Sequence, residues 1–259
     1  HRPGGGTAVG VAGMGAGRGV GAAPKALGAS AWWGDRRIRP PLLEAEPFDR
    51  KDLRTLYEVE ARGLLEAAGV PVPRGLVVPV VDAVVASASL TGRVVVKATG
   101  MAHKTEAGRV AVDLAGAAEV GAALAGMGLA DDGPVLVEEF VDDAVVELLV
   151  SVRREPPVGW LLTLGIGGTL VELLGDTTSL LLPVDADEVL AALRGLAGWP
   201  LIEGHRGNPP ADLDALVATI LGIVGVVEVR PDLVELECNP VLARPVGAIT
   251  VDALAIVVD

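Results

Sequence analysis

Patterns typical of helices and of strands alternate along the chain from about Phe48 to its end. Residues 52–68 carry apolar side chains at helical spacing, and Gly69 is a natural stop for a helix there. Short β-branched runs lie between the helical segments, and the clearest of them covers residues 94–96 and ends at Lys97. This alternation predicts an α/β fold.

The same reasoning gives the expected elements of the whole chain. The expected helices cover residues 52–68, 81–89, 117–127, 185–196 and 211–224. The expected strands cover residues 76–78, 94–97, 110–114, 135–139, 147–153, 161–164, 233–238 and 248–251. We therefore expect the folded domain to span residues 48–259.

Residues 1–47 lack any such periodicity. The first fifty residues hold 11 of the 34 glycines and carry a net charge of +3, which leaves −16 for the rest of the chain. A dinucleotide loop at residues 13–19 is disfavoured, because no β-branched strand precedes it and no amphipathic helix follows. We interpret residues 1–47 as a flexible Gly-rich linker or the remnant of an upstream domain.

Composition narrows the class of protein. With 259 residues, 51% hydrophobic and 21% charged, the chain can bury a sizeable core. The single cysteine, Cys238, excludes a disulfide scaffold and favours a reducing, cytoplasmic setting. No charge-free stretch has the length and apolarity of a membrane span. The net charge of −13 argues against a nucleic-acid protein, so a phosphate-bearing ligand would be met by a few cations, metal ions or backbone amides.

The strongest local signal is a cluster of cationic and titratable residues. The chain has four lysines and three histidines, yet Lys97, His103 and Lys104 lie within eight residues, in a loop that contains Gly100 and Gly108. A lysine at the end of an apolar strand is costly unless it meets an anion, and glycines let backbone amides approach one. A phosphate site and a plain surface loop, with Lys97 reaching solvent, both fit this pattern.

A second signal lies near the C-terminus. Strand alternation places Glu235, Glu237 and Asn239 on one face and Cys238 on the other. The first face is acidic and rich in oxygen atoms. For Cys238 a buried thiol is the expected state.

The acidic face is a candidate metal site. If the strand at residues 248–251 lies beside it, Asn239 and Asp252 could share Mg²⁺, which prefers oxygen ligands. The alternative is a solvated strand face in which Asn239 and Pro240 make a turn.

Several motifs occur together in a specific order. They are Glu60 to Pro73 (EARGLLEAAGVPVP), the strand ending at Lys97, His103 to Gly108 (HKTEAG), Val137 to Val141 (VEEFV), Gly165 to Gly168 (GIGG) with Glu172 and Asp176, Gly204 to Gly207 (GHRG), and Glu237 to Pro240 (ECNP) with Asp252. From about Leu53 to Val257 the chain resembles the ATP-grasp domain of NDP-forming acyl-CoA synthetases, the family of ADP-forming acetate–CoA ligase.

The resemblance implies an ATP-grasp fold, in which two subdomains clamp a nucleotide. It implies that Lys97 contacts the nucleotide phosphates as a compact cation. It also implies that the backbone of Glu139, Phe140 and Val141 forms a hinge that reads adenine, and that Glu147 is the acidic nucleotide-binding residue of the next strand.

The resemblance further implies ATP or ADP and Mg²⁺ as ligands. Asn239 and Asp252 match the magnesium-binding pair, with Glu237 nearby. His103 matches a histidine that accepts the phosphoryl group, and a neutral imidazole is a competent nucleophile. Arg109 departs from the family, which has a second glycine there, so its side chain could crowd the phosphate or add a cation.

The activity implied is that of an acid–thiol ligase: ATP, a small carboxylic acid and CoA give acyl-CoA, ADP and phosphate. The chain shows no CoA-binding or ligase domain, so a partner subunit or a fused domain is expected to supply them. The alternative is a non-catalytic or regulatory ATP-grasp module of a multidomain acyltransferase.

Overall fold

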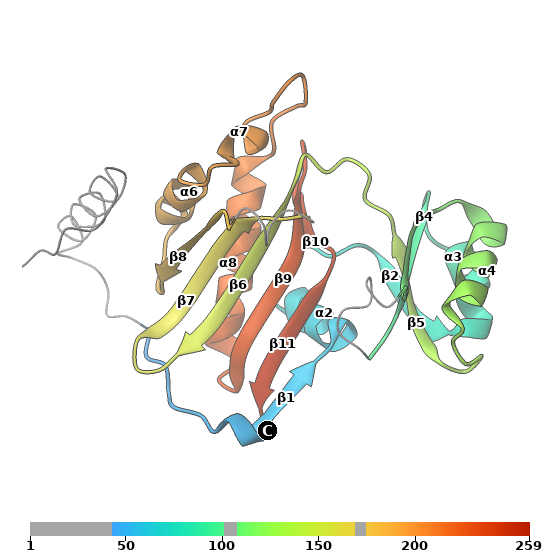
Figure 1. Cartoon of the computed structure of the whole chain (residues 1–259), viewed down its shortest axis with the longest axis horizontal. Helices are drawn as coiled ribbons and strands as arrows, with labels where there is room; N and C mark the ends of the chain where they lie inside the picture. The colour runs from blue at the N-terminus through green and yellow to red at the C-terminus, as the bar shows by residue number, and fades with distance from the viewer. Residues whose placement is uncertain (1–42, 101–107, 169–174) are drawn as a thin grey trace, which may run out of the picture. The chain divides into compact units, whose positions relative to one another are not determined.

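The computed structural model describes residues 43–100, 108–168 and 175–259. Within these ranges the strands form a seven-stranded sheet and a four-stranded sheet (Figure 1). All neighbouring strands run antiparallel. The predictions for residues 1–42, and for His103, lie outside the described residues.

The large sheet has the strand order β1-β11-β9-β6-β7-β8, with β10 paired to β9. Its strands are β1 (Leu53–Leu56), β6 (Val146–Glu155), β7 (Gly159–Ile166), β8 (Thr177–Leu181), β9 (Leu233–Ala243), β10 (Ala248–Thr250) and β11 (Ala253–Val258). The associated helices are the short 3₁₀ turn η1 (Arg50–Asp52), α2 (Glu58–Ala67), α6 (Ala186–Arg194), α7 (Trp199–Ile202) and α8 (Leu213–Val229).

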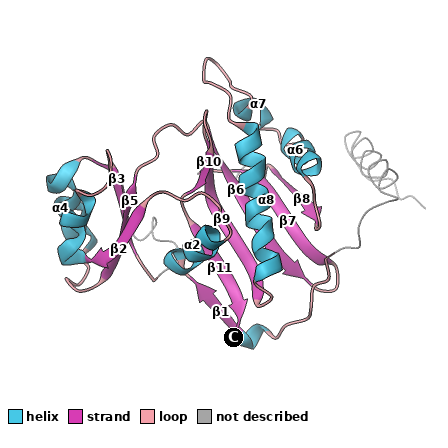
Figure 2. Ribbon diagram, turned by 180° about the vertical axis from the view of Figure 1, so that it is seen from behind, coloured by secondary structure: helices cyan, strands magenta, loops and turns pink. Residues whose placement is uncertain are grey.

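Helices α2, α6 and α8 pack on one face of the large sheet (Figure 2). Strand β6 alternates buried and less buried positions, so its apolar side chains, such as Leu148, enter the core with Leu162 of β7 and Ile220 of α8. Helix α6 begins with a capping box, in which Asp185 and Glu188 satisfy each other's backbone amides.

The small sheet has the order β2-β5-β3-β4. Its strands are β2 (Gly75–Pro79), β3 (Val94–Ala98), β4 (Val110–Leu114) and β5 (Pro134–Glu139), and its helices are η2 (Val80–Asp82), α3 (Ala83–Ser87) and α4 (Gly116–Met127). Val94 and Val96 of β3 join the core beneath α3 and α4. Strand alternation therefore sends Lys97 to the opposite face.

The predicted helix at residues 52–68 was wrong at its start. Helix α2 begins at Glu58, and the preceding Leu53–Leu56 is strand β1, which pairs with β11 in the register Leu53↔Val258. Leucines three residues apart suit a helix. This short segment is nevertheless the edge strand of the large sheet, and its pairing partner is β11, the last strand of the chain. A contact across the whole sequence decided its conformation.

Strands β8 and β11 were not predicted, and β9 is longer than expected. Strand β9 continues through Asn239 and Pro240 to Ala243, so these two residues do not make a turn. It continues because β10 and β11 both pair with it and supply hydrogen-bond partners on that side.

Residues 43–47 were grouped with the linker by the sequence, but in the structure they contact the large sheet. Leu43 donates its amide to the carbonyl of Leu182, and Leu43 and Ala45 pack against the core. These apolar residues are too few to show a period, which is why the pattern did not reveal them. Among the helices in the described ranges, none has the length and apolarity needed to cross a membrane.

Candidate nucleotide site

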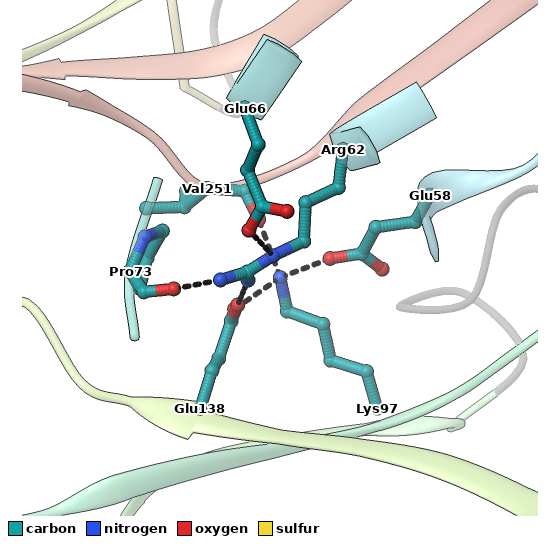
Figure 3. A network of polar contacts seen from close by, with 7 residues as sticks. All are labelled: Glu58, Arg62, Glu66, Pro73, Lys97, Glu138 and Val251. Carbon is teal, nitrogen blue, oxygen red and sulfur yellow. Dashed lines mark hydrogen bonds and ion pairs between the residues drawn. The ribbon is translucent and has the colours of Figure 1, made fainter. Parts of the chain in front are cut away.

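Lys97 is buried on β3 with 6% of its surface exposed. Its ammonium nitrogen lies 2.6 Å from a carboxylate oxygen of Glu58 and 2.7 Å from one of Glu138, and it donates to the carbonyl of Val251 (Figure 3). A buried ammonium is tolerated only when it is paired in this way. The burial excludes the alternative of a lysine that merely reaches solvent from a surface loop.

Arg62 completes the network from helix α2. Its guanidinium lies 2.7 Å from Glu138 and 2.9 Å from Glu66, and it donates to the carbonyl of Pro73 (Figure 3). Glu58 and Arg62 are four residues apart, so they share one face of α2. Two ion pairs therefore join α2 to the small sheet, Glu58 with Lys97 and Arg62 with Glu138.

Sequence reasoning gave no role to Glu58, Arg62 or Glu138. One signal was available: in strand 134–139 the alternation that buries Leu136 also places Glu138 on the buried face beside the lysine strand. An anion at such a position needs a cation partner.

Two of the predicted metal ligands, Glu237 and Asn239, lie on β9, and the third, Asp252, lies between β10 and β11. The amide of Asn239 donates to the carbonyl of Asp252 at 3.1 Å, and Ala253 is the register partner of Cys238. Glu237 and Asn239 share the less buried face of β9, while Cys238 is fully buried on the other face, as predicted.

The structure also brings this acidic face to the lysine. The carbonyl that Lys97 contacts belongs to Val251, the residue before Asp252, and the amide of Val251 bonds to Pro240 beside Asn239. In the described part of the chain, no group of three or more acidic, histidine or cysteine side chains forms a ready metal cluster. The donor set of two carboxylates and an amide oxygen suits Mg²⁺, which commonly fills its remaining positions with phosphate and water.

Burial and two nearby carboxylates raise the pKa of the Cys238 thiol, which lies on the other face of β9. Burial raises the pKa of Cys238 far above its ordinary value, and Glu237 and Asp252 raise it further. The thiol therefore stays protonated and is not a nucleophile. Burial also raises the pKa of Glu235, against the opposing effect of its register partner Arg153.

The predicted hinge follows β5. The carboxylate of Glu139 accepts hydrogen bonds from the amide and hydroxyl of Thr91, which lower its pKa. The amide of Glu139 donates to the backbone carbonyl of Arg74 at 2.9 Å, and the amide of Phe140 donates to the backbone carbonyl of Arg93 at 2.8 Å. These two amides are used inside the protein, so an adenine ring at this hinge would be read by carbonyl groups or by the amide of Val141.

Two contacts fasten the hinge to the large sheet. Asp143 makes a bidentate ion pair with Arg244 at 2.5 and 2.8 Å, and the amide of Val145 bonds to Ala243. Bonding to Arg244 lowers the pKa of Asp143. The segment that follows the predicted hinge is therefore held at the end of β9.

Glu147 lies at the start of β6 with its side chain exposed. Its carbonyl accepts from the amide of Gly167, and a Cβ added to Gly167 would lie 2.7 Å from the Glu147 backbone. A Cβ on Gly168 would lie 3.6 Å from the Glu147 carboxylate. Gly167 thus allows a close backbone approach that keeps Glu147 beside the end of β7.

Arg109 points away from Lys97. Its guanidinium donates to the carbonyl of Met127 at the end of α4, and its own carbonyl pairs with Ala98. The arginine caps a helix on the far face of the small sheet, so it neither crowds a phosphate near Lys97 nor adds a cation there.

A sequence profile described as an ATP-grasp domain matches residues 48–257. The chain belongs to the ATP-grasp family. The two sheets, with Lys97 on one and the acidic strand on the other, agree with the fold that the sequence implied.

The chain is similar to characterised relatives. It is 30% identical over 197 residues to the ADP-forming acetate–CoA ligase of Methanocaldococcus jannaschii, covering 71% of this chain and 28% of the relative. It is 28% identical over 211 residues to the β subunit of ADP-forming acetate–CoA ligase I of Pyrococcus furiosus, covering 77% of this chain and 90% of the subunit. The chain thus spans nearly the whole of this β subunit and under a third of the length of the Methanocaldococcus relative.

Two solved structures of an acetyl-coenzyme A synthetase are also similar to this chain. A chain of dinucleotide-forming acetyl-coenzyme A synthetase 1 of Ca. Korarchaeum cryptofilum, in complex with coenzyme A and Ca-AMPCP, has a TM-score of 0.73 and 27% identity, covering 79% of this chain and 93% of that one. The same enzyme with coenzyme A and Mg-AMPPCP, its phosphohistidine segment pointing towards the nucleotide binding site, has a TM-score of 0.69 and 29% identity, covering 78% and 92%.

Proposed function

We propose that this chain is the ATP-grasp component of a cytoplasmic ADP-forming acyl-CoA synthetase, which converts ATP, a small carboxylic acid and CoA into acyl-CoA, ADP and phosphate. Its own step is phosphoryl transfer between Mg-ATP and a histidine. The observation that carries the proposal is the contact of Lys97 with the carbonyl of Val251, the residue before Asp252, whose own carbonyl accepts from the amide of Asn239. A cation and a set of oxygen ligands side by side are what a magnesium–polyphosphate complex requires.

The share of each relative that aligns with this chain supports a separate origin for the other parts of the enzyme. The aligned region covers 90% of the β subunit of Pyrococcus furiosus but 28% of the ADP-forming acetate–CoA ligase of Methanocaldococcus jannaschii. The CoA-binding and ligase parts therefore come from a partner subunit or a fused domain. CoA and the carboxylic acid are substrates of that assembly.

Each candidate residue has a role that suits its chemistry. The ammonium of Lys97 faces the phosphates and offsets their charge before and during transfer. Glu237, Asn239 and Asp252 hold Mg²⁺, which neutralises phosphate charge and orients the oxygens when bound. The hinge at Glu139 to Val141 binds adenine, and Glu147 adds an acceptor from β6.

His103 is the phosphoryl acceptor in this proposal. A neutral ring nitrogen forms a bond to the γ-phosphorus while the bond from that phosphorus to the β,γ-bridging oxygen breaks, and ADP leaves with the electron pair. The ring then loses its remaining N–H proton. In the partner, the phosphoryl group passes to the carboxylic acid and the thiol of CoA displaces phosphate from the acyl phosphate.

The test is to incubate the chain with ATP labelled at the γ-phosphate and Mg²⁺, with and without the partner subunit, and to measure acid-labile phosphate on the protein. We expect labelling of the wild type and none of His103→Ala. The affinity of His103→Ala for Mg-ATP should remain near that of the wild type, because a neutral imidazole contributes little to nucleotide binding in the ground state.

His205→Ala is the matched control, because His205 is exposed and should label normally. A His103→Ala protein that is still phosphorylated at near the wild-type rate would refute the acceptor role. A wild type that binds Mg-ATP but is never phosphorylated, and that supports no synthesis with its partner, would favour the regulatory module.

A further inference from the structure

The ammonium of Lys97 has no donor to spare. A lysine ammonium carries three N–H donors. In the structure the ammonium donates to the carboxylate of Glu58 and to the carbonyl of Val251, and it forms an ion pair with the carboxylate of Glu138 at 2.7 Å. A nucleotide phosphate can therefore bind Lys97 directly only if it replaces one of these three acceptors.

Glu138 is badly placed to be replaced. It lies on β5, the strand next to β3 in the same sheet, and has 2% of its surface exposed. Arg62 holds it from the other side at 2.7 Å. Separating Glu138 from Lys97 would require a change within one sheet.

Replacing only the carbonyl of Val251 is also unfavourable. The incoming phosphate would then share Lys97 with two carboxylates. Like charges within a few ångströms repel strongly in a buried site, where the effective dielectric constant is low. The exchange that avoids this repulsion removes one of the carboxylates.

Glu58 is the remaining acceptor; it is also buried, with 7% of its surface exposed, but it lies on a different element. It comes from helix α2, which packs on the large sheet, whereas Lys97 belongs to the small sheet (Figure 3). Exchanging Glu58 for a phosphate replaces one anion by another at the same ammonium. It also opens one of the two ion pairs that join α2 to the small sheet, while the Arg62–Glu138 pair remains.

We propose that Glu58 is the counter-ion of Lys97 in the nucleotide-free protein and that a nucleotide phosphate displaces it on binding. Glu58 is thus a positioning residue. It keeps the ammonium aligned when the site is empty and lowers nucleotide affinity by competing with the phosphates. The inference rests on the proposed function, in which Lys97 is the phosphate-binding cation.

The test measures binding by calorimetry on the full chain with Mg-ATP, ADP, AMP and adenosine. Glu58→Gln removes the competing charge but keeps the shape of the side chain. We expect Glu58→Gln to tighten the binding of Mg-ATP roughly tenfold and the binding of AMP by a smaller factor. The affinity for adenosine, which has no phosphate, should not change. A merely structural role would not produce this dependence on phosphate. In a Lys97→Met background the effect of Glu58→Gln should vanish.

The matched control is Glu60→Gln. Glu60 lies on the same helix but its side chain is 51% exposed and pairs with Arg54, so its loss should change no affinity. Glu58→Asp is a second variant for the case that Glu58→Gln fails to fold. It keeps the negative charge, but its shorter side chain places the carboxylate farther from Lys97. We expect it to tighten Mg-ATP binding by a smaller factor, and unchanged or weaker binding by Glu58→Asp counts against the proposal.

The outcomes separate this inference from the proposed function. If Lys97→Met weakens Mg-ATP binding while Glu58→Gln leaves it unchanged or weakens ATP and adenosine alike, the displacement of Glu58 is wrong and the nucleotide site stands. If the wild type binds no Mg-ATP, both are overturned.

Discussion

Lys97 and the acidic face of β9 supply opposite charges to one candidate site, but their surroundings differ. Lys97 is 6% exposed and lies in a network of two acids, an arginine and backbone carbonyls. Glu237 is half-buried and Asn239 is exposed. One part of the site is closed by ion pairs, and the other is accessible to a hydrated ion.

The difference follows from the cost of burying each charge. An ammonium inside a sheet must keep partners at all times, so its binding of a ligand is an exchange of anions. Glu237 at the face of β9 is only half-buried, so a metal ion can reach its carboxylate from solvent. Substitutions should therefore affect stability at Lys97 and ion dependence at the acidic face.

The largest effect is expected for Lys97→Met. It removes the proposed phosphate-binding cation and leaves Glu58 and Glu138 buried with less positive charge, so both nucleotide affinity and stability should fall. We expect a loss of about 3 kcal/mol in the free energy of unfolding and about a hundredfold weaker Mg-ATP binding. Urea denaturation and calorimetry measure the two.

Lys51→Met is the control for this change, because the side chain of Lys51 is 87% exposed and lies 4.0 Å from Asp49. It should alter neither quantity. Equal effects of the two substitutions would show that burial of Lys97 has no energetic consequence.

Asp252→Asn tests the proposed role of Asp252 as a metal ligand. Removing one carboxylate should weaken the apparent affinity for Mg²⁺ roughly tenfold in the presence of ATP, since a hard divalent cation prefers charged oxygen. A titration of nucleotide binding against magnesium concentration measures it. Glu228→Gln, at an exposed position of α8, is the control, and a magnesium dependence that did not move in Asp252→Asn would contradict the ligand assignment.

Gly167→Ala tests the packing that keeps Glu147 beside β7. The added Cβ would lie 2.7 Å from the Glu147 backbone, so we expect a loss of about 1–3 kcal/mol in the free energy of unfolding. Gly63→Ala is the matched control, because a Cβ there meets nothing within 4 Å and lies inside helix α2. That variant should gain about 0.5–1 kcal/mol, and destabilisation of both would refute the steric argument.

The smallest effect is expected at the hinge, for Asp143→Asn. The pair with Arg244 is partly exposed, so its loss should cost about 0.2–1 kcal/mol at neutral pH. Because the pKa of Asp143 is lowered in the folded protein, its contribution is complete above the ordinary value of 3.8 and is lost as the pH falls through the lower, folded value.

Urea denaturation at pH 7 and near pH 2 checks this sign. The difference between wild type and Asp143→Asn should shrink towards zero at the lower pH. A difference that grew on acidification would mean that the carboxylate is not the stabilised form.

Local sequence patterns determined a good part of the fold. The β-branched run before Lys97, and the alternation of Glu235, Glu237 and Asn239 with buried neighbours, describe β3 and β9 well. These signals are local, because each residue's face follows from the strand period alone. The order of motifs likewise indicated the ATP-grasp fold.

Long-range contacts decided the rest. Leu53–Leu56 became a strand because the chain's last strand pairs with it, and β9 ran on through Pro240 because β10 and β11 lie beside it. No local period encodes such partners. The direction of Arg109 was also open in the sequence, and the end of α4 fixed it.

For the candidate site the sequence determined which residue types could bind phosphate and magnesium: a lysine ending an apolar strand, and oxygen ligands on one strand face. Only the tertiary structure brought Glu58 to Lys97 from 39 residues away and Val251 from 154 residues away. A buried charge must find its partners wherever the fold supplies them, and distance along the chain carries no information about which those are.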